Sequence, residues 1–232
     1  LVILGFIAPF AIFLGASPFQ LGLLSALPKL FNALGQIQAA RLVSTLGSRK
    51  RMVTRMVLYS TIPWALMALT PFLPGSSQIW ALIILSGIAV ALMSMLEPAW
   101  GSWISDLVPL SERGKILGTR LSVATLFTFT FSLIIASLLD RLADAVLWGF
   151  IGLFALAFNL RLISYVFFSG MSDLSSSFKS HEASNSINGL WYFAKNIHNS
   201  NLGAFTIYIL VLYFGMGLVA PIYALYLIRD LG

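Results

Sequence analysis

Four polar residues recur at helical spacing within an apolar stretch near the start of the chain. They are Ser25, Lys29, Asn32 and Gln36, called the polar stripe below. On a helix that turns by about 100° per residue, all four side chains fall within an arc of about 60°. The stripe could line an aqueous path in which the Lys29 amine attracts an anionic group of a solute. Alternatively, its members could bond to neighbouring helices and hold a bundle together.

A second candidate is Glu97, which lies inside the apolar stretch 79–104 and is followed by Pro98. A carboxyl group at bilayer depth can take up and release a proton, so Glu97 is a candidate for proton coupling. The structural alternative is that Glu97 meets arginines of the loop that follows it. Along the expected helices Lys29 and Glu97 differ in depth by roughly 15 Å, so we do not expect them to pair directly.

Two further kinds of side chain are predicted to anchor the protein at the membrane surface. Arg161 lies about two turns from the end of the stretch 145–168, and its long side chain can reach lipid headgroups; a role in binding substrate is the alternative. Trp100 and Trp103 close the stretch 79–104, at a depth where tryptophan commonly meets the membrane interface.

The elements that carry these residues are predicted to be membrane-spanning helices. Hydrophobic residues make up 59% of the 232 residues and charged residues only 9%, which is too apolar for a soluble domain of this size. The apolar runs are continuous and longer than the strands of an outer-membrane barrel, so the predicted fold class is all-α, a polytopic helical membrane protein. We predict seven spans: 1–15, 21–40, 52–73, 79–104, 116–139, 145–168 and 202–228.

The first predicted span is short and the chain opens on Leu1, so we expect a piece of a longer protein that is cut inside its first helix. Residues 1–169 are predicted to form a six-helix bundle with this truncated first helix. Residues 170–201 are expected to form a cytoplasmic central loop with an interfacial helix at 187–197, and 202–232 to begin a second bundle. No repeat of three helices is evident within the first six spans.

Basic residues set the predicted orientation, because cytoplasmic loops are enriched in Lys and Arg. Only Arg141 and Arg229 lie beside the gaps on one side of the predicted membrane. We therefore place the N-terminus and the basic loops in the cytoplasm and the chain in the plasma membrane. The net charge of +6 indicates anionic lipid as the partner, not nucleic acid. The gaps on the cytoplasmic side carry Arg41, Arg49, Lys50, Arg51, Arg55, Arg113, Lys115, Arg120, Lys179 and Lys195.

Motifs for enzymatic chemistry are absent from the sequence. There is no cysteine, and the two histidines stand in a polar segment without metal-ligand spacing. No Walker loop, dinucleotide fingerprint or zinc-protease helix motif is present. We therefore expect neither a cofactor nor a metal, and no enzyme.

Two of the basic loops resemble a known family. After the fourth span, Pro109 is followed by Arg113-Gly114 and by Gly118-x-Arg120, which is similar to the Pro-x-x-x-Arg-Gly-x-x-x-Gly-x-Arg signature of the major facilitator superfamily of secondary transporters. After the second span, the segment 46–51, Leu-Gly-Ser-Arg-Lys-Arg, is similar to the family's loop between helices two and three.

The match of the loop after the second span is incomplete. Ser44 stands where members usually have an Asp, and Ala40 replaces the usual opening Gly. The charge relay attributed to that Asp therefore does not carry over to this chain.

The resemblance implies a small solute that binds between two six-helix bundles and is moved by alternating access, with twelve helices in the intact protein and a missing C-terminal half as partner. The basic loops would then act as a cytoplasmic latch. Their alternative role is to anchor and cap helices, with Gly47 ending a helix in a left-handed turn. A non-transporting scaffold or lipid-handling protein is the other function considered, whereas a seven-helix receptor would start outside. The expected gating residues are Gly47, Arg49, Lys50, Asp106, Arg113, Gly118 and Arg120.

Overall fold

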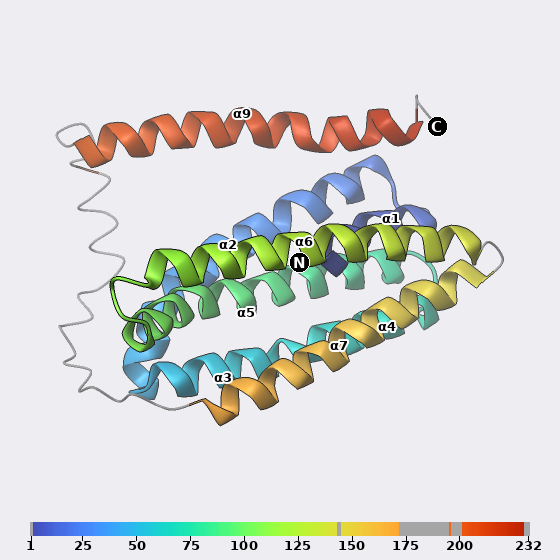
Figure 1. The fold of residues 1–232 in the computed structure, drawn as a ribbon. Coiled ribbons are helices and arrows are strands. Elements are labelled where there is room, and N and C mark those ends of the chain that lie inside the picture. The colour runs from blue at the N-terminus through green and yellow to red at the C-terminus, as the bar shows by residue number, and fades with distance from the viewer. Residues whose placement is uncertain (1, 143–144, 172–194, 196–200, 230–232) are drawn as a thin grey trace. The chain divides into compact units, whose positions relative to one another are not determined.

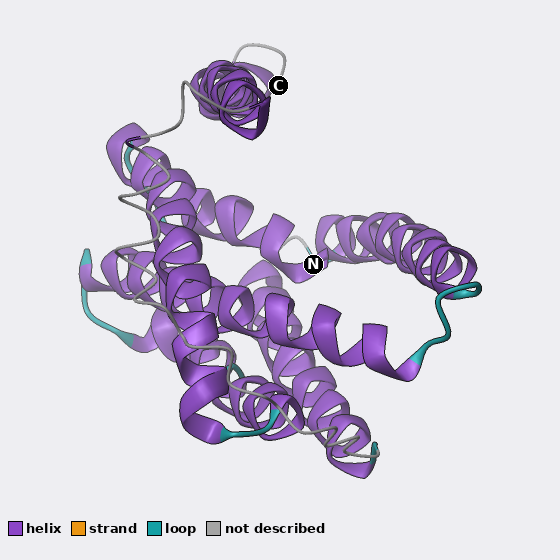
Figure 2. Cartoon of the chain, turned by 90° about the vertical axis from the view of Figure 1, so that its left-hand side faces the viewer, coloured by secondary structure: helices purple, strands orange, loops and turns teal. Residues whose placement is uncertain are grey.

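The described part of the chain is helical throughout. The computed structural model describes residues 2–142, 145–171, 195 and 201–229, with the backbone alone at 2, 40, 44, 105–107, 202 and 218–229. Figures 1 and 2 show helices joined by short turns, with no strand among the described residues. The predicted all-α class is confirmed. Contacts divide the chain into two units, residues 1–179 and 180–232, and each is described by itself.

The first unit contains a succession of nine short and long helices within its described residues, and the second contains one long helix. In chain order they are η1 (Val2–Phe6), α1 (Ile7–Phe13), α2 (Pro18–Leu46), α3 (Arg49–Tyr59), α4 (Thr61–Leu69), η2 (Thr70–Phe72), α5 (Ser77–Leu107), α6 (Arg113–Arg141), α7 (Val146–Gly170) and α9 (Asn201–Arg229).

Four segments of the described chain are long and apolar enough to cross a membrane. They agree with four of the predicted spans to within a few residues, and they are Arg49–Phe72, Ser77–Ile104, Arg113–Arg141 and Val146–Gly170. The helix α2 is equally long at 29 residues but is not among them, because the polar stripe lowers its apolar character.

The ends of α2 follow from local chemistry. Ser17 caps its start, accepting a hydrogen bond from the Gln20 backbone N–H while the Gln20 side chain accepts one from the Ser17 backbone N–H. Gly47 ends it in the left-handed conformation, with φ at 62°, as the sequence predicted. The helix therefore extends beyond the predicted span at both ends.

The third span departs from its prediction, because it is two helices instead of one. The break falls at Ser60, between α3 and α4. Pro63 lacks a backbone N–H and its ring crowds the carbonyl of the preceding turn, which is where the helix is interrupted. The buried Ser60 hydroxyl donates to the Val57 carbonyl oxygen and the Thr61 hydroxyl to that of Leu58, both at 2.7 Å. In Figure 1, α3 and α4 follow one another beside α7.

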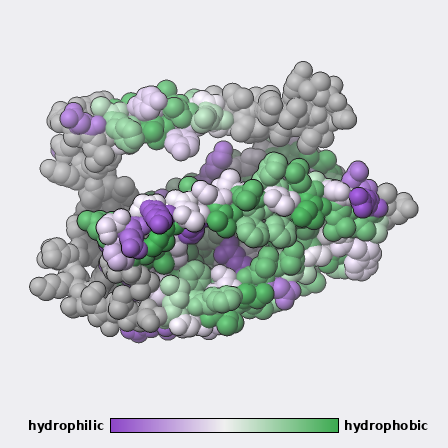
Figure 3. All heavy atoms as spheres, viewed as in Figure 1, coloured by the Kyte–Doolittle hydropathy of each residue, from purple (hydrophilic) through white to green (hydrophobic). Residues whose placement is uncertain are grey.

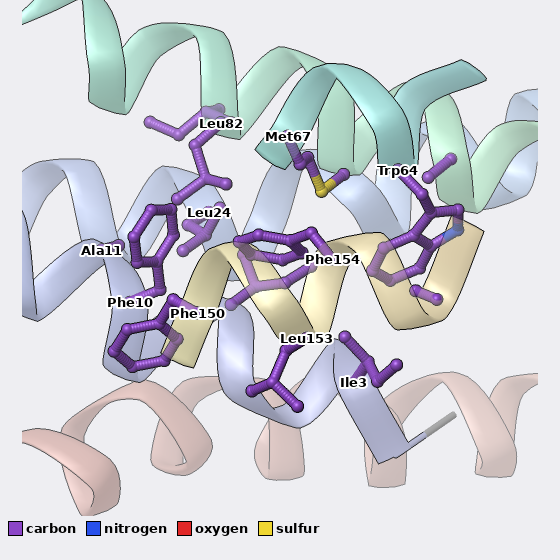
Figure 4. Packing of buried hydrophobic residues seen from close by; sticks show 14 of the residues in the cluster. Ile3, Phe10, Ala11, Leu24, Trp64, Met67, Leu82, Phe150, Leu153 and Phe154 are labelled. Carbon is purple, nitrogen blue, oxygen red and sulfur yellow. The ribbon is translucent and has the colours of Figure 1, made fainter. Parts of the chain in front are cut away.

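The larger core is built mainly of aliphatic side chains and contains a cluster of aromatic rings (Figure 4). The ring centroid of Phe10 on α1 lies 4.9 Å from that of Phe150 and 5.2 Å from that of Phe154, both on α7. Trp64 on α4 lies 6.3 Å from Phe154. Since such ring pairs add to the benefit of close packing, this cluster ties the first, third and sixth spans together.

A smaller core joins α2, α3, α5 and α7 near the end of α5. Met52 and Val53 on α3 are fully buried there beside Trp103 on α5. The ring of Trp103 is 6.3 Å from that of Phe168 on α7. Trp103 is therefore a core residue, and its prediction as a membrane-interface anchor is wrong.

Helix pairing shows an order that the sequence did not reveal. The second span packs on the fourth through α2 and α5, and the first touches the fifth through η1 and α6. If three is added to or subtracted from each span number, the pair of spans two and four becomes the pair of spans five and one. The contacts α3 to α5 and α7 to η1 are related in the same way. The first six spans thus pair as two related groups of three.

Candidate functional site

The polar stripe lies on the surface of the first unit. Ser25, Lys29 and Gln36 are exposed and Asn32 is half-buried. The Gln36 side-chain amide donates to the Asn32 side-chain oxygen at 2.7 Å, so these two groups satisfy each other along α2. Among the residues that the structure describes, Ser25 and Lys29 make no hydrogen bond or ion pair. The stripe therefore does not hold α2 to its neighbours in the described part of the chain.

Two glycines, which the sequence reasoning missed, bring α2 and α5 together. A Cβ atom on Gly35 would lie 2.6 Å from the Ala91 carbonyl oxygen, and one on Gly87 would lie 2.8 Å from the Phe31 ring. At Gly35 the backbones of the two helices therefore approach closely, and at Gly87 the missing side chain makes room for the Phe31 ring. The signal in the sequence was the row of small residues Ser86, Gly87, Ala91 and Ser94 on α5.

Glu97 is exposed on α5. The alternative of a pair with arginines of the following loop is not seen, since the Glu97 carboxylate makes no ion pair or hydrogen bond with any described residue. Pro98 lacks the N–H that would bond to the Ser94 carbonyl, so the helix is weakened beside this carboxylate. Glu97 remains a candidate for proton coupling.

Arg161 contacts a neighbouring helix within the first unit, which is evidence against its predicted anchoring role. Its guanidinium Nη2 lies 2.6 Å from the Met93 sulfur on α5, and the residue is half-buried. A thioether is a weak acceptor compared with an oxygen. The positive charge of Arg161 is thus held inside the first unit, between α7 and α5.

The first basic loop is reduced to two residues, Gly47 and Ser48. The Ser48 hydroxyl accepts a hydrogen bond from the Arg51 backbone N–H at 3.2 Å and so begins α3. Arg49 and Lys50 consequently stand in the first turn of α3, where the helix dipole is also positive.

The second basic loop joins α5 to α6 through a tight turn. The Glu112 backbone N–H donates to the Pro109 carbonyl oxygen at 3.0 Å, and Arg113 Nε donates to the Val108 carbonyl oxygen at 3.1 Å. The carboxylate of Glu112 makes no ion pair with any residue described by the structure. The Arg113 guanidinium thus binds a backbone carbonyl at the end of α5.

Arg120 contacts an aromatic ring. Its guanidinium lies over the Trp100 ring, 3.9 Å from the centroid, and links α6 to α5 by a cation–π interaction. Gly118 is exposed, and a side chain there would meet nothing within 4 Å. Of Asp106 the structure describes the backbone, which is helical.

Other expected features fall partly or wholly outside the described residues. The predicted interfacial helix at 187–197 is described only at Lys195, which is helical and exposed. Within the described residues there is no group of three His, Cys, Asp or Glu that could hold a metal ion.

The chain matches the model of the Major Facilitator Superfamily over residues 2–232 and belongs to this family. No curated protein and no solved structure is detectably similar to it. Proteins of this family are transporters and not enzymes, and they handle small-molecule substrates in a lipid bilayer. The chain is therefore a multi-pass integral membrane protein of a transporter family.

Proposed function

We propose that this protein moves a small solute across the membrane by alternating access. The solute would bind near the midplane, at the bundle formed by residues 1–169, with a second bundle of the kind that the family resemblance implies. Rocking of the two bundles would expose the solute to each side in turn. The basic loops and the N-terminus would lie in the cytoplasm, with the protein in the plasma membrane.

The observation that carries this proposal is the polar stripe with the free Lys29 amine. A charge at bilayer depth costs several kcal/mol unless it meets water or an opposite charge. Lys29 has neither hydrogen-bond nor ion-pair partner among the described residues, and it is exposed. An aqueous path and a solute with an anionic group would together remove this cost. Ser25, Asn32 and Gln36 would provide further hydrogen bonds along the same path.

The gate would lie at the cytoplasmic ends of α2, α3, α5 and α6. Gly47, Arg49 and Lys50 surround one turn, and Asp106, Arg113, Gly118 and Arg120 surround the other. The contact between Arg120 and Trp100 is worth about 0.5–1 kcal/mol at an exposed site. A switch between inward and outward states would need several such contacts that form in one state and separate in the other. Glu97 is the proposed site for coupling to protons.

Uptake by the complete gene product in proteoliposomes tests the proposal. A panel of small anionic, zwitterionic and neutral solutes would be compared with empty liposomes. We expect faster uptake of at least one anionic or zwitterionic solute, and a loss of about tenfold or more in Lys29→Ala. The matched control is Gln38→Ala, an exposed residue of α2 that lies outside the polar stripe.

If no solute in the panel enters faster than into empty liposomes, the transport proposal fails. The alternative, a non-transporting scaffold or lipid-handling protein, would then be preferred. Equal uptake in Lys29→Ala and wild type would contradict the assigned path while leaving transport in place.

A further inference from the structure

We propose that Arg161 on α7 and Glu97 on α5 form a charge pair that is open in this structure and closes in another conformation of the bundle. In the open state the guanidinium rests on Met93, and in the closed state it moves one helical turn along α5 to Glu97. This inference concerns the interior of one bundle and goes beyond the proposed solute path on α2.

The first step is that Arg161 has fewer hydrogen-bond acceptors around it, among the described residues, than its guanidinium has donors. A guanidinium carries five N–H donors, and a half-buried one requires acceptors because it has lost water. Its only hydrogen-bond partner among the described residues is the Met93 sulfur, at 2.6 Å. Breaking a buried pair by removing one partner is strongly destabilising, so a lasting state without an anionic partner is unfavourable.

The second step is the position of Glu97. Met93 and Glu97 are four residues apart on α5, so their side chains lie on one face, about 6 Å apart along the helix. Glu97 is about 15 Å from the end of α5 at Leu107, and Arg161 about 14 Å from the end of α7 at Gly170. The two charges therefore lie at nearly the same depth.

The third step is that long side chains of α5 and α7 meet on both sides of Glu97, although the two backbones lie apart and α3 packs against both of them. One contact is Arg161 with Met93, and the next is the ring pair of Trp103 and Phe168, at 6.3 Å. Glu97 falls between these two contacts along α5. A change of side-chain rotamer at Arg161 could thus reach the carboxylate without separating the helices.

The fourth step is that Glu97 is accessible and lies beside a weakened turn of α5. It is exposed, and Pro98 removes a helical hydrogen bond beside it. The other described carboxylates of the first unit stand at the helix ends or turns, at Glu112 and Asp140. Glu97 is therefore the partner at the right depth. When this pair opens or closes, the angle between α5 and α7 would change together with the conformation of the bundle.

A charge swap tests the pair through the melting temperature (Tm) of the complete protein in detergent. Arg161→Glu and Glu97→Arg should each lower Tm by roughly 5–10 °C. The double variant should recover at least half of the combined loss. The matched control combines Lys29→Glu with Glu97→Arg, which exchanges charges between α2 and α5 and should show simple addition. If the Tm losses of the single variants simply add in both double variants, the proposal is wrong.

Thiol cross-linking keeps the test valid if the charge variants fold poorly. The chain has no cysteine, so introduced pairs report without background. Arg161→Cys would be combined with Met93→Cys, with Glu97→Cys, and with the control Ile84→Cys further along α5. We expect a short bifunctional thiol reagent to link the first two pairs and not the third.

If the Glu97 pair stays unlinked like the Ile84 control, the closed state does not occur and the proposal is wrong. Neither measurement needs a solute. A failure here would leave the transport proposal untouched, and the absence of solute uptake would leave this pair untouched.

Discussion

Two long helices of the first unit, α2 and α6, expose much of their surface but expose different chemistry. The outward side of α2 includes the charged Lys29 and the polar Ser25 and Gln36. The helix α6 has a single buried residue, Ile135, and presents leucine, valine and phenylalanine along most of its length. In Figure 3 apolar residues dominate the middle of α6 and hydrophilic residues gather toward its ends.

Lipid can cover the exposed face of α6, but it cannot cover the polar stripe of α2 without a cost in free energy. Hydrocarbon chains accept the apolar face of α6 at no cost, whereas the Lys29 amine on α2 requires water or an opposite charge. The burial of α2 against α5 through Gly35 leaves its polar stripe on the outside, so the stripe is available to a path. An exposed residue on α6 is therefore expected to face lipid, whereas an exposed residue of the polar stripe on α2 is expected to face water or a solute.

The largest effect is expected when a charged residue is placed in the apolar face of α6. Leu126→Lys puts a charge in the middle of its apolar face, where Leu126 is 65% exposed. Insertion should become less favourable by about 3–4 kcal/mol if this face meets lipid. The measurement is the yield and Tm of folded protein, with Leu110→Lys in the turn as the control, which should change little. A normal yield of Leu126→Lys would mean that water or a polar partner covers this face.

Thiol labelling should distinguish the two surfaces by a smaller factor. Single cysteines at Ser25 and Gln36 on α2 and at Leu126 and Leu133 on α6 would react with a charged methanethiosulfonate in liposomes. We expect the α2 positions to react at least about tenfold faster, because the thiolate that reacts forms only where water enters. Equal rates on both helices would remove the distinction between a wet and a lipid-covered face.

The smallest effect concerns the glycines near the ends of these helices that join the basic loops. Gly47→Ala should destabilise the fold by about 1 kcal/mol, because φ at Gly47 is 62° and alanine avoids this region. Gly118→Ala should be neutral or stabilising by up to about 1 kcal/mol, since Gly118 is exposed within α6 and a side chain there meets nothing. Tm measurements of both variants test this; a larger loss at Gly118 would indicate a close approach in another conformation.

Local patterns carried much of the prediction. The apolar runs predicted four spans that the structure confirms, and Gly47 predicted the end of α2. The two basic loops indicated the family, which the match over residues 2–232 confirms. These features depend on neighbouring residues in the chain, so they can be derived from spacing and residue type alone.

Contacts between helices could not be derived in this way. The sequence placed Arg161 at the lipid headgroups and Trp103 at the membrane interface, whereas the structure places one on Met93 and the other in a core. Both residues are amphipathic, and either environment suits them by residue type. The break at Ser60 was also missed, although Pro63 marked it, because a proline can bend a membrane helix without dividing it.

The sequence by itself determined that the chain is helical, that it belongs in a membrane, and that its polar stripe lies on one side of α2. Composition and helical periodicity are sufficient for these conclusions, because the bilayer requires each span to satisfy its own backbone. Only the tertiary structure decided which side of each helix is covered. Gly35 brings α2 against α5, and Arg161 lies beside Met93. The physical reason is that helix packing depends on the shapes of surfaces that meet across the bundle, and residue spacing within one helix does not contain that information.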